Sequence, residues 1–343
     1  MSSSEENETV SQQKQLKEQL VSLNREELLR LRSTPGHYEC VRLLKIGCPE
    51  SYEELLSLLQ DLAGDVNSKS SVNLENNKRK VQLISDGLQK SEVFHRQGDW
   101  KTAYKARESL ALCFSEHDED IDLAKHFFIS CLTMCLEQPD SERKTRAFVY
   151  QNLGLLDERA GNFQSALTHL ETAAELAKTV PCMGKGGKTL LYREIAGQCH
   201  QVCLTLGSLV KKGDASGPLF YYYKALDHAL VAKDKKAEAK AHYKISLEYL
   251  EEGMNYQLAE EHLKKYKKLC QETDDLEGLC QAHHGLATIQ ERQGNRGAAL
   301  KVLKECLKKT EELDESKSLE MLAISNVKLG ILYTSMELQL SAI

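Results

Sequence analysis

The sequence predicts an all-α protein built from repeated helical hairpins. The chain of 343 residues contains only five prolines and 6% aromatic residues. Its abundant Leu, Ala, Glu and Lys residues lose little side-chain freedom in a helix. The segment NLGLLDERAGNFQSALTHLETA, residues 152–173, also places small residues at fixed distances, because Gly161, Ala166 and Ala173 follow Gly154 by seven, twelve and nineteen positions. Such spacing is typical of helices that pack closely against each other.

The same spacing recurs along the chain and defines a repeat. The key small residue returns as Gly207, Ser246, Ala287 and Gly330, at separations of 53, 39, 41 and 43 positions. These separations exceed the roughly 34 residues of a tetratricopeptide repeat, so longer helices and turns are expected. The sequence therefore predicts a tetratricopeptide-like solenoid of antiparallel helix pairs wound into a right-handed superhelix.

Each small residue has a packing role in this interpretation. Gly154 on the first helix and Ala166 on the second let the two backbones approach, while Leu153, Phe163 and Leu170 fill the surrounding space. Leu is common in any helix, so the prediction depends on the combination of positions and on its return along the chain.

Residues 1–75 are predicted to form a partly disordered amino-terminal region with two or three amphipathic helices. Asn24 with Glu27, and Ser51 with Glu54, have the spacing of capping boxes ahead of apolar runs. The polar stretches in this region lack the apolar residues needed for a packed core.

Residues 76–140 are predicted to hold a divergent first hairpin and a connecting helix, and residues 141–343 the repeat array. The array ends within its last repeat, where Leu338 and Ile343 would lie on the stub of a second helix. A stub of this length is too short to be stable alone. We therefore expect an incompletely covered apolar face there, available for docking.

Charge and hydropathy exclude several classes of protein. The formal net charge of −6 disfavours general nucleic-acid binding, which requires a basic face. The longest apolar stretch, residues 126–136, is too short to cross a membrane, and the amino terminus lacks the pattern of a secretory signal. The chain is expected in the cytoplasm or in a compartment continuous with it.

Eleven cysteines without an export signal are interpreted as reduced thiols. Cys131 with Cys135, and Cys199 with Cys203, share helix faces and are expected to pack between helices. His200 beside Cys199 suggests a metal only superficially, so no metal and no cofactor are predicted.

No catalytic motif supports an enzyme. Gly187-Lys188-Thr189 resembles the end of a phosphate-binding loop, but Cys182 stands where that loop requires Gly, and a helix precedes it instead of a strand. His283 and His284 near Cys280 are expected on a first helix, in surface or packing roles. A non-catalytic binding protein is predicted.

The candidate binding site is the groove formed by the first helices of the repeats. In such an array, positions 2, 5, 9, 12 and 13 of the repeat face the groove. These positions hold Gln151, Glu158, Arg159, Gln201, Lys211, Lys212, Lys240, Tyr243, His284, Thr288, Glu291 and Arg292. Their charges and amides suit an extended peptide or a helix of a partner protein. Any one of them could instead be only a solvated helix residue.

A clamp for the carboxyl terminus of a chaperone is disfavoured. Such clamps use Asn at a groove position where this chain has Leu155, Ser208 and Leu247.

Two long segments resemble a tetratricopeptide-repeat family of motile cilia and sperm flagella. They are ECVRLLKIGCPESYEELLSLL, residues 39–59, and residues 233–309, which include KDKKAEAKAHYKISLEYLEEGMNYQLAEEHLKKYKKLC. The resemblance covers roughly residues 38–340 and implies a non-catalytic component of the axoneme in the ciliary cytoskeleton, required for motility. It implies axonemal dynein or intraflagellar transport proteins as partners. Members of this family continue through further helices, so functions of that distal segment are not expected here.

A second hypothesis stays open. The chain could be a soluble adaptor for peptides or motor cargo, similar to kinesin light chains, that binds its partners transiently.

Overall fold

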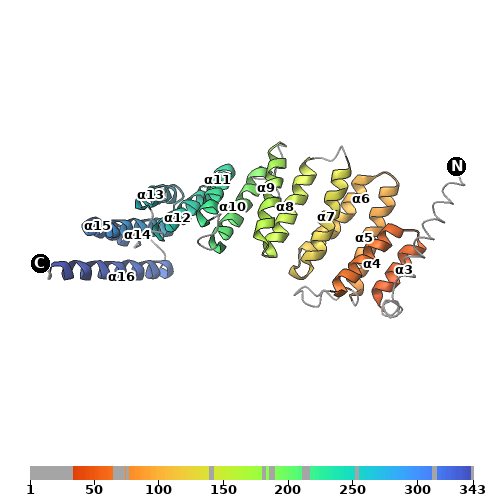
Figure 1. Ribbon diagram of the computed structural model, residues 1–343, viewed down its shortest axis with the longest axis horizontal. Coiled ribbons are helices and arrows are strands. Elements are labelled where there is room, and N and C mark those ends of the chain that lie inside the picture. The colour runs from red at the N-terminus through yellow and green to blue at the C-terminus, as the bar shows by residue number, and fades with distance from the viewer. Residues whose placement is uncertain are drawn as a thin grey trace. The chain divides into compact units, whose positions relative to one another are not determined.

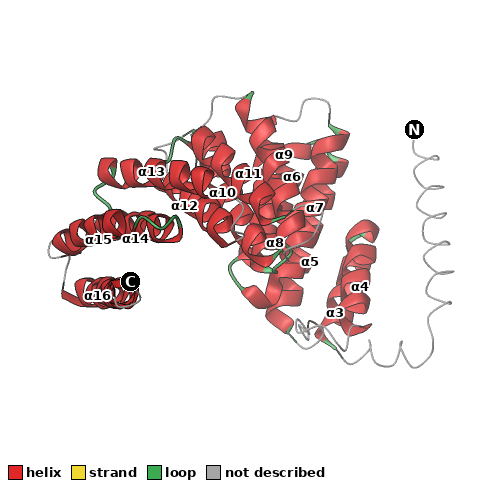
Figure 2. Cartoon of the chain, turned by 60° about the vertical axis from the view of Figure 1, so that its left-hand side comes forward, coloured by secondary structure: helices red, strands yellow, loops and turns green. Residues whose placement is uncertain are grey.

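The computed structural model describes residues 34–64, 74, 77–138, 143–179, 183–184, 190–210, 217–251, 255–310 and 315–340. Apart from one isolated bridge between Met183 and Leu190, the regular structure in these ranges is helical (Figure 2). The all-α prediction is confirmed. Asn24 and Glu27, the loop from Cys182 to Thr189 except two residues, and Lys211 and Lys212 lie outside the described ranges.

The helices group into two compact units, Met1–Asp140 and Ser141–Ile343. The first unit contains α3 (Pro35–Lys45), α4 (Pro49–Gly64), α5 (Lys78–Arg96), α6 (Trp100–Ser115), a 3-10 turn η2 (Asp118–Asp120) and α7 (Ile121–Glu137) (Figure 1). Thr34 and Asp99 cap the starts of α3 and α6 by accepting from the backbone N–H groups of His37 and Thr102. Its core includes fully buried Leu55, Ile84 and Phe127.

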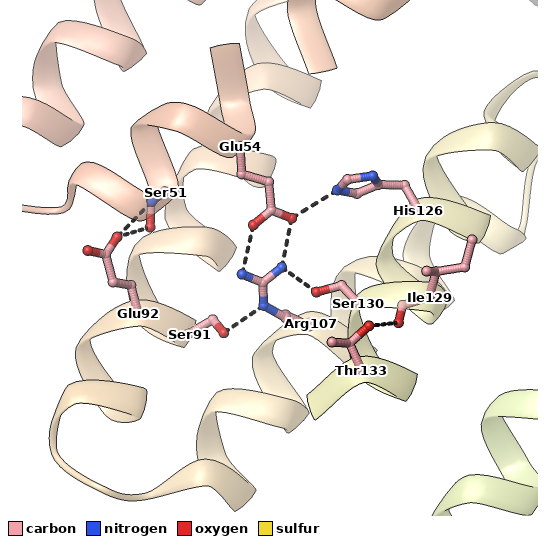
Figure 3. A network of polar contacts seen from close by, with 9 residues as sticks. All are labelled: Ser51, Glu54, Ser91, Glu92, Arg107, His126, Ile129, Ser130 and Thr133. Atoms are coloured by element: carbon pink, nitrogen blue, oxygen red, sulfur yellow. Dashed lines mark hydrogen bonds and ion pairs between the residues drawn. The ribbon is translucent and has the colours of Figure 1, made fainter. Parts of the chain in front are cut away.

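A polar network crosses the core of this first unit (Figure 3). Arg107 of α6 donates to both carboxylate oxygens of Glu54 on α4, each at 2.7 Å, and also to Ser91 and Ser130. His126 of α7 lies 2.9 Å from the same carboxylate. Burial alone would raise the pKa of Glu54, but the hydrogen bonds from His126 and Arg107 outweigh it and lower the pKa to about 2. Glu54 is therefore a charged tertiary contact.

The expected capping box at Ser51 and Glu54 is wrong. Helix α4 already begins at Pro49, so Ser51 lies inside it. The backbone N–H of Ser51 donates to Glu92 of α5 at 2.8 Å, and the Ser51 hydroxyl donates to the same oxygen (Figure 3). Both residues of the expected box bind neighbouring helices instead of the start of their own.

The second unit is a series of helical hairpins. Four antiparallel pairs are α8 (Arg143–Arg159) with α9 (Phe163–Lys178), α10 (Leu191–Leu209) with α11 (Pro218–Ala232), α12 (Lys235–Glu251) with α13 (Tyr256–Glu272), and α14 (Leu276–Arg292) with α15 (Arg296–Thr310). Helix α16 (Glu315–Leu340) follows and packs on α14 and α15. The predicted helical-hairpin repeat is confirmed.

The small residues lie where the hairpins are tightest. A Cβ atom added to Gly154 on α8 would lie 2.6 Å from the Leu170 side chain and 3.1 Å from the Ala166 carbonyl oxygen on α9. The turns of two hairpins use Gly161 and Gly294, whose φ angles of 81° and 82° favour glycine. A Cβ atom at Gly207 on α10 would likewise clash with the Tyr222 ring of α11, so in these two hairpins the small residue marks a close contact between the paired helices.

The end of the array differs from the expectation. Helix α16 continues without a turn to Leu340, because the segment TSMELQL that follows Tyr333 contains neither Gly nor Pro. A Cβ atom at Gly330 would meet nothing within 4 Å, so this last small residue serves no close contact in the described structure. Leu329 and Leu332 are buried, whereas Val327 and Ile331 are 61% and 57% exposed.

The four cysteines that the sequence spaces as two i, i+4 pairs are free thiols in helix interfaces. Cys131, Cys135, Cys199 and Cys203 are buried, and burial raises the pKa of Cys199 and of Cys203 to about 12. His200 donates through Nδ1 to the Ala225 carbonyl oxygen at 2.9 Å, which links α10 to α11. None of the helices in the described ranges is long and apolar enough to cross a membrane.

Candidate binding cleft

A cleft of about 690 Å³ opens between four helices of the second unit. Leu204 of α10, one face of α12, Tyr266 of α13, and the turn from α13 to α14 with the first part of α14 contribute its lining residues. The lining residues are Leu204, Lys236, Ala239, Lys240, Tyr243, Lys244, Tyr266, Thr273, Asp274, Asp275, Leu276, Glu277, Gly278 and Gln281. This volume is within the range of natural ligand sites.

One face of α12 supplies the basic wall. Lys236, Ala239, Lys240, Tyr243 and Lys244 follow an i, i+3, i+4, i+7, i+8 pattern, which places them on one side of a helix. The other side of α12 holds buried residues such as Ala241 and Ile245, and their packing fixes which face reaches the cleft. The lysine row is thus held on a rigid element.

The cleft lysines differ from other lysines of the same unit. Lys235 binds Glu272 at 2.8 Å, and Lys224 binds Glu171 at 2.7 Å. Within the described part of the chain, Lys236, Lys240 and Lys244 form no ion pair. Their charges are available to a ligand.

Two tyrosines of the lining, which we call the floor, supply its aromatic surface. The rings of Tyr243 and Tyr266 lie 4.9 Å apart between centroids at an interplanar angle of 31°, and the Tyr266 hydroxyl donates to Gln281 Oε1 at 3.0 Å. Burial raises the pKa of both hydroxyls, so both stay protonated. The floor offers aromatic surface together with neutral hydrogen-bonding groups.

The lining from the turn between α13 and α14 is acidic. Asp274 has a φ of 53°, and Asp275 caps α14 by accepting from the Gly278 N–H at 3.0 Å. A Cβ atom at Gly278 would lie 2.6 Å from Cys270 Sγ, so glycine allows the turn to pack against α13. The cleft therefore has a basic wall on α12 and an acidic wall on the turn.

Two of the sequence-predicted groove residues, Lys240 and Tyr243, line this cleft. Two others lie elsewhere and require correction. Gln151 is fully buried and donates to Gln198 of α10 at 3.1 Å, and His284 is 7% exposed with Nε2 2.6 Å from the Ser325 hydroxyl of α16. Both face a neighbouring first helix, because stacking covers these helices on more than one side.

The remaining predicted residues are dispersed. Thr288 accepts from Lys328 of α16 at 3.2 Å, and Arg292 donates to the Leu250 carbonyl oxygen at the end of α12. Glu158 is half-buried, which raises its pKa. Arg159, Gln201 and Glu291 are exposed outside the cleft.

Sequence reasoning missed much of the lining. Lys236 and Lys244 repeat the Lys240 position at intervals of four, a signal that was present on α12. Asp274 and Asp275 lie on the turn after a second helix, where a rule restricted to first helices does not search. Tyr266 is on α13 and reaches the cleft only through the packing of the hairpin.

Comparison with known proteins identifies one group of relatives. Proteins from Macaca fascicularis and Homo sapiens named tetratricopeptide repeat protein 29 are 25% and 24% identical to this chain over 293 residues. The alignments cover 83% of this chain and 61% of each relative. The chain resembles tetratricopeptide repeat protein 29. It spans about three fifths of the length of these tetratricopeptide repeat protein 29 relatives.

Other matches cover the fold or a part of the chain. The profile of the cohesin loading factor family matches residues 232–330, less than a third of the sequence. The apo form of RapI is 13% identical with a TM-score of 0.46, covering 90% of this chain and 83% of that one. Tetratricopeptide-like repeats of a putative kinesin light chain from Podosopora anserina are 14% identical with a TM-score of 0.36, covering 61% and 94%.

The hairpin fold and the tetratricopeptide repeat protein 29 relatives together support a repeat-based interaction scaffold.

Proposed function

We propose that this chain is a non-catalytic scaffold that binds a segment of a partner protein in the cleft between α12 and α14. The cleft itself supports this proposal most directly, because it combines an aromatic floor with three lysines that have no ion-pair partner among the described residues. Concave sites with few convergent polar groups are common ligand sites, and helical-repeat surfaces bind extended segments.

The setting that we propose is the motile cilium or sperm flagellum. The resemblance to tetratricopeptide repeat protein 29 motivates this choice. The partners would then be axonemal dynein or intraflagellar transport proteins, and the scaffold would serve motility.

A peptide selection tests the cleft as the binding site. Random peptides displayed on phage are selected on the folded full chain, and each selected peptide is then tested for protection of lysines against an amine-acetylating reagent. We expect the selected peptides to slow acetylation of Lys236, Lys240 and Lys244. Exposed Lys301, Lys304 and Lys308 of α15 are matched controls outside the cleft and should react at unchanged rates.

The selection can also refute the site. If the selected peptides protect no cleft lysine, or if no peptide is selected, the cleft is not the binding site that we propose.

Extraction of isolated cilia tests the setting. An axonemal component stays with the axoneme when detergent removes the membrane and is released only by strong salt. A transient adaptor of the kinesin light chain type would leave with the detergent-soluble fraction, and complete release there would contradict the axonemal proposal.

A further inference from the structure

We propose that the α12–α14 cleft selects partner segments that are acidic along one side. The lysine row, which consists of Lys236, Lys240 and Lys244, binds their carboxylates. This inference rests on the proposed function and adds the chemistry of the partner. It follows from the spacing of the lysines, the charge of the acidic wall and the aromatic floor.

The spacing of the lysines matches acidic protein segments. Residues four apart on a helix are separated by about 6 Å along its axis. Lys236, Lys240 and Lys244 thus present three ammonium groups at about this interval, if their side chains extend alike. Alternate residues of an extended chain lie about 6.7 Å apart, and residues four apart on a partner helix about 6 Å apart. Carboxylates at either interval meet successive lysines.

The acidic wall makes the selection one-sided. A segment that is acidic all round would bring carboxylates close to Asp274 and Asp275, where like charges repel. The Asp275 carboxylate is already engaged by the Gly278 N–H, so it stays in place as part of the turn. The preferred segment is acidic toward α12 and neutral or basic toward the turn from α13 to α14.

The same wall argues against a nucleic acid. A nucleic-acid strand carries a phosphate at every nucleotide, and its binding sites are generally basic throughout. Here three lysines share the cleft lining with Asp274, Asp275 and Glu277, in a chain whose formal net charge is −6.

The floor adds an apolar requirement. Tyr243, Tyr266, Leu204 and Leu276 line the cleft together with the charged residues, and the two tyrosine rings contact each other. An apolar or aromatic side chain between the acidic positions of the partner would bury its surface there. The predicted ligand therefore has acidic residues that flank an apolar one.

Charge reversal tests this inference on the full chain. Three proteins are compared in the phage selection: the wild type, the cleft variant K236E/K240E/K244E, and the control variant K301E/K304E/K308E. The control changes the net charge equally on exposed lysines of α15 that do not line the cleft. We expect Asp and Glu to be enriched with the wild type and the control, and Lys and Arg with the cleft variant.

Affinities give the quantitative result. A fluorescent peptide selected by the wild type should bind the cleft variant at least about tenfold more weakly and the control within about twofold. Raising the salt from about 50 to about 300 mM should weaken wild-type binding, since exposed charges are screened. Circular dichroism verifies that each variant is folded, and the milder triple change to Gln replaces the cleft variant if it is not.

Each other outcome decides against the inference, and one of them also against the proposed function. Peptides that protect the cleft lysines but show no acidic enrichment would overturn the inference and leave the proposed function intact. Failure to select any cleft-protecting peptide would overturn both. Lysine-dependent binding of a single-stranded RNA oligonucleotide, without binding of acidic peptides, would show that the lysine row serves a nucleic acid and would also overturn the inference.

Discussion

His242 of α12 and His262 of α13 form a buried pair in which the two Nδ1 atoms lie 2.8 Å apart. One ring must donate and the other accept, so the accepting ring has no proton on Nδ1 and is neutral. Burial lowers the pKa of both rings, and that of His242 falls to about 4, with the neighbouring His262 as a further cause. This pair joins α12, which contributes five of the cleft-lining residues, to α13, which contributes Tyr266.

The histidine pair predicts a loss of stability in acid. Because its folded-state pKa lies below the unfolded value of about 6.5, His242 contributes stability that is present above pH 6.5 and is lost as the pH falls toward 4. We expect the free energy of unfolding, measured by urea titration, to decrease across this window. His242→Gln should show a shallower decrease. An identical pH dependence for the variant and the wild type would contradict the assignment.

The Glu54–Arg107 pair predicts a large effect of one neutral substitution. Glu54→Gln removes a carboxylate that Arg107 and His126 both bind, which leaves the Arg107 charge in a largely enclosed site. The side chains are 15% and 20% exposed, so we expect a loss of roughly 2–3 kcal/mol, below the 3–5 kcal/mol of a fully buried pair. Exposed Glu116→Gln should stay within about 0.5 kcal/mol. Equal unfolding midpoints for the two variants would refute a stabilising role.

Two glycine substitutions test the packing of the hairpins. Gly154→Ala adds a Cβ atom against Leu170 and the Ala166 carbonyl oxygen, so we expect a destabilisation of about 1–3 kcal/mol. Gly197→Ala on α10 meets nothing within 4 Å and should stabilise by about 0.5–1 kcal/mol through better helix propensity. Thermal unfolding followed by circular dichroism measures both. The two substitutions should change the melting temperature in opposite directions. A Gly154→Ala variant that melts like the wild type would mean that the contact with Leu170 is looser than described.

We expect the last helix, α16, to open locally more often than the helices before it. Ser325 ties α16 to α14 through His284, but Val327 and Ile331 on another side of α16 are exposed. We expect backbone hydrogen exchange in residues 325–335 to be faster than in residues 280–305, and His284→Ala to increase it further. Protection of α16 equal to that of α14 would contradict this prediction.

Local contacts explain why the hairpins could be predicted. Gly154, Ala166 and Leu170 meet within one helical pair, so their sequence spacing encodes the contact directly. The turn glycines Gly161 and Gly294 are similarly local, since each accommodates a positive φ.

Contacts between successive pairs could not be read in the same way. Gln151 and His284 have the spacing of groove residues, yet a neighbouring first helix covers each of them. Ser51 and Glu54 have the spacing of a cap, yet α5 and α6 provide their partners. In both cases a tertiary neighbour changes the role that the local pattern indicates.

We propose that the cleft between α12 and α14 holds a partner segment. Hydrogen exchange of the full chain, with and without a selected peptide, tests it most directly because this measurement reports every segment at once. We expect slower exchange in residues 235–244 and 273–281 and unchanged exchange in residues 296–310. Protection confined to α15, α16 or the amino-terminal unit, with none in the cleft segments, would contradict it.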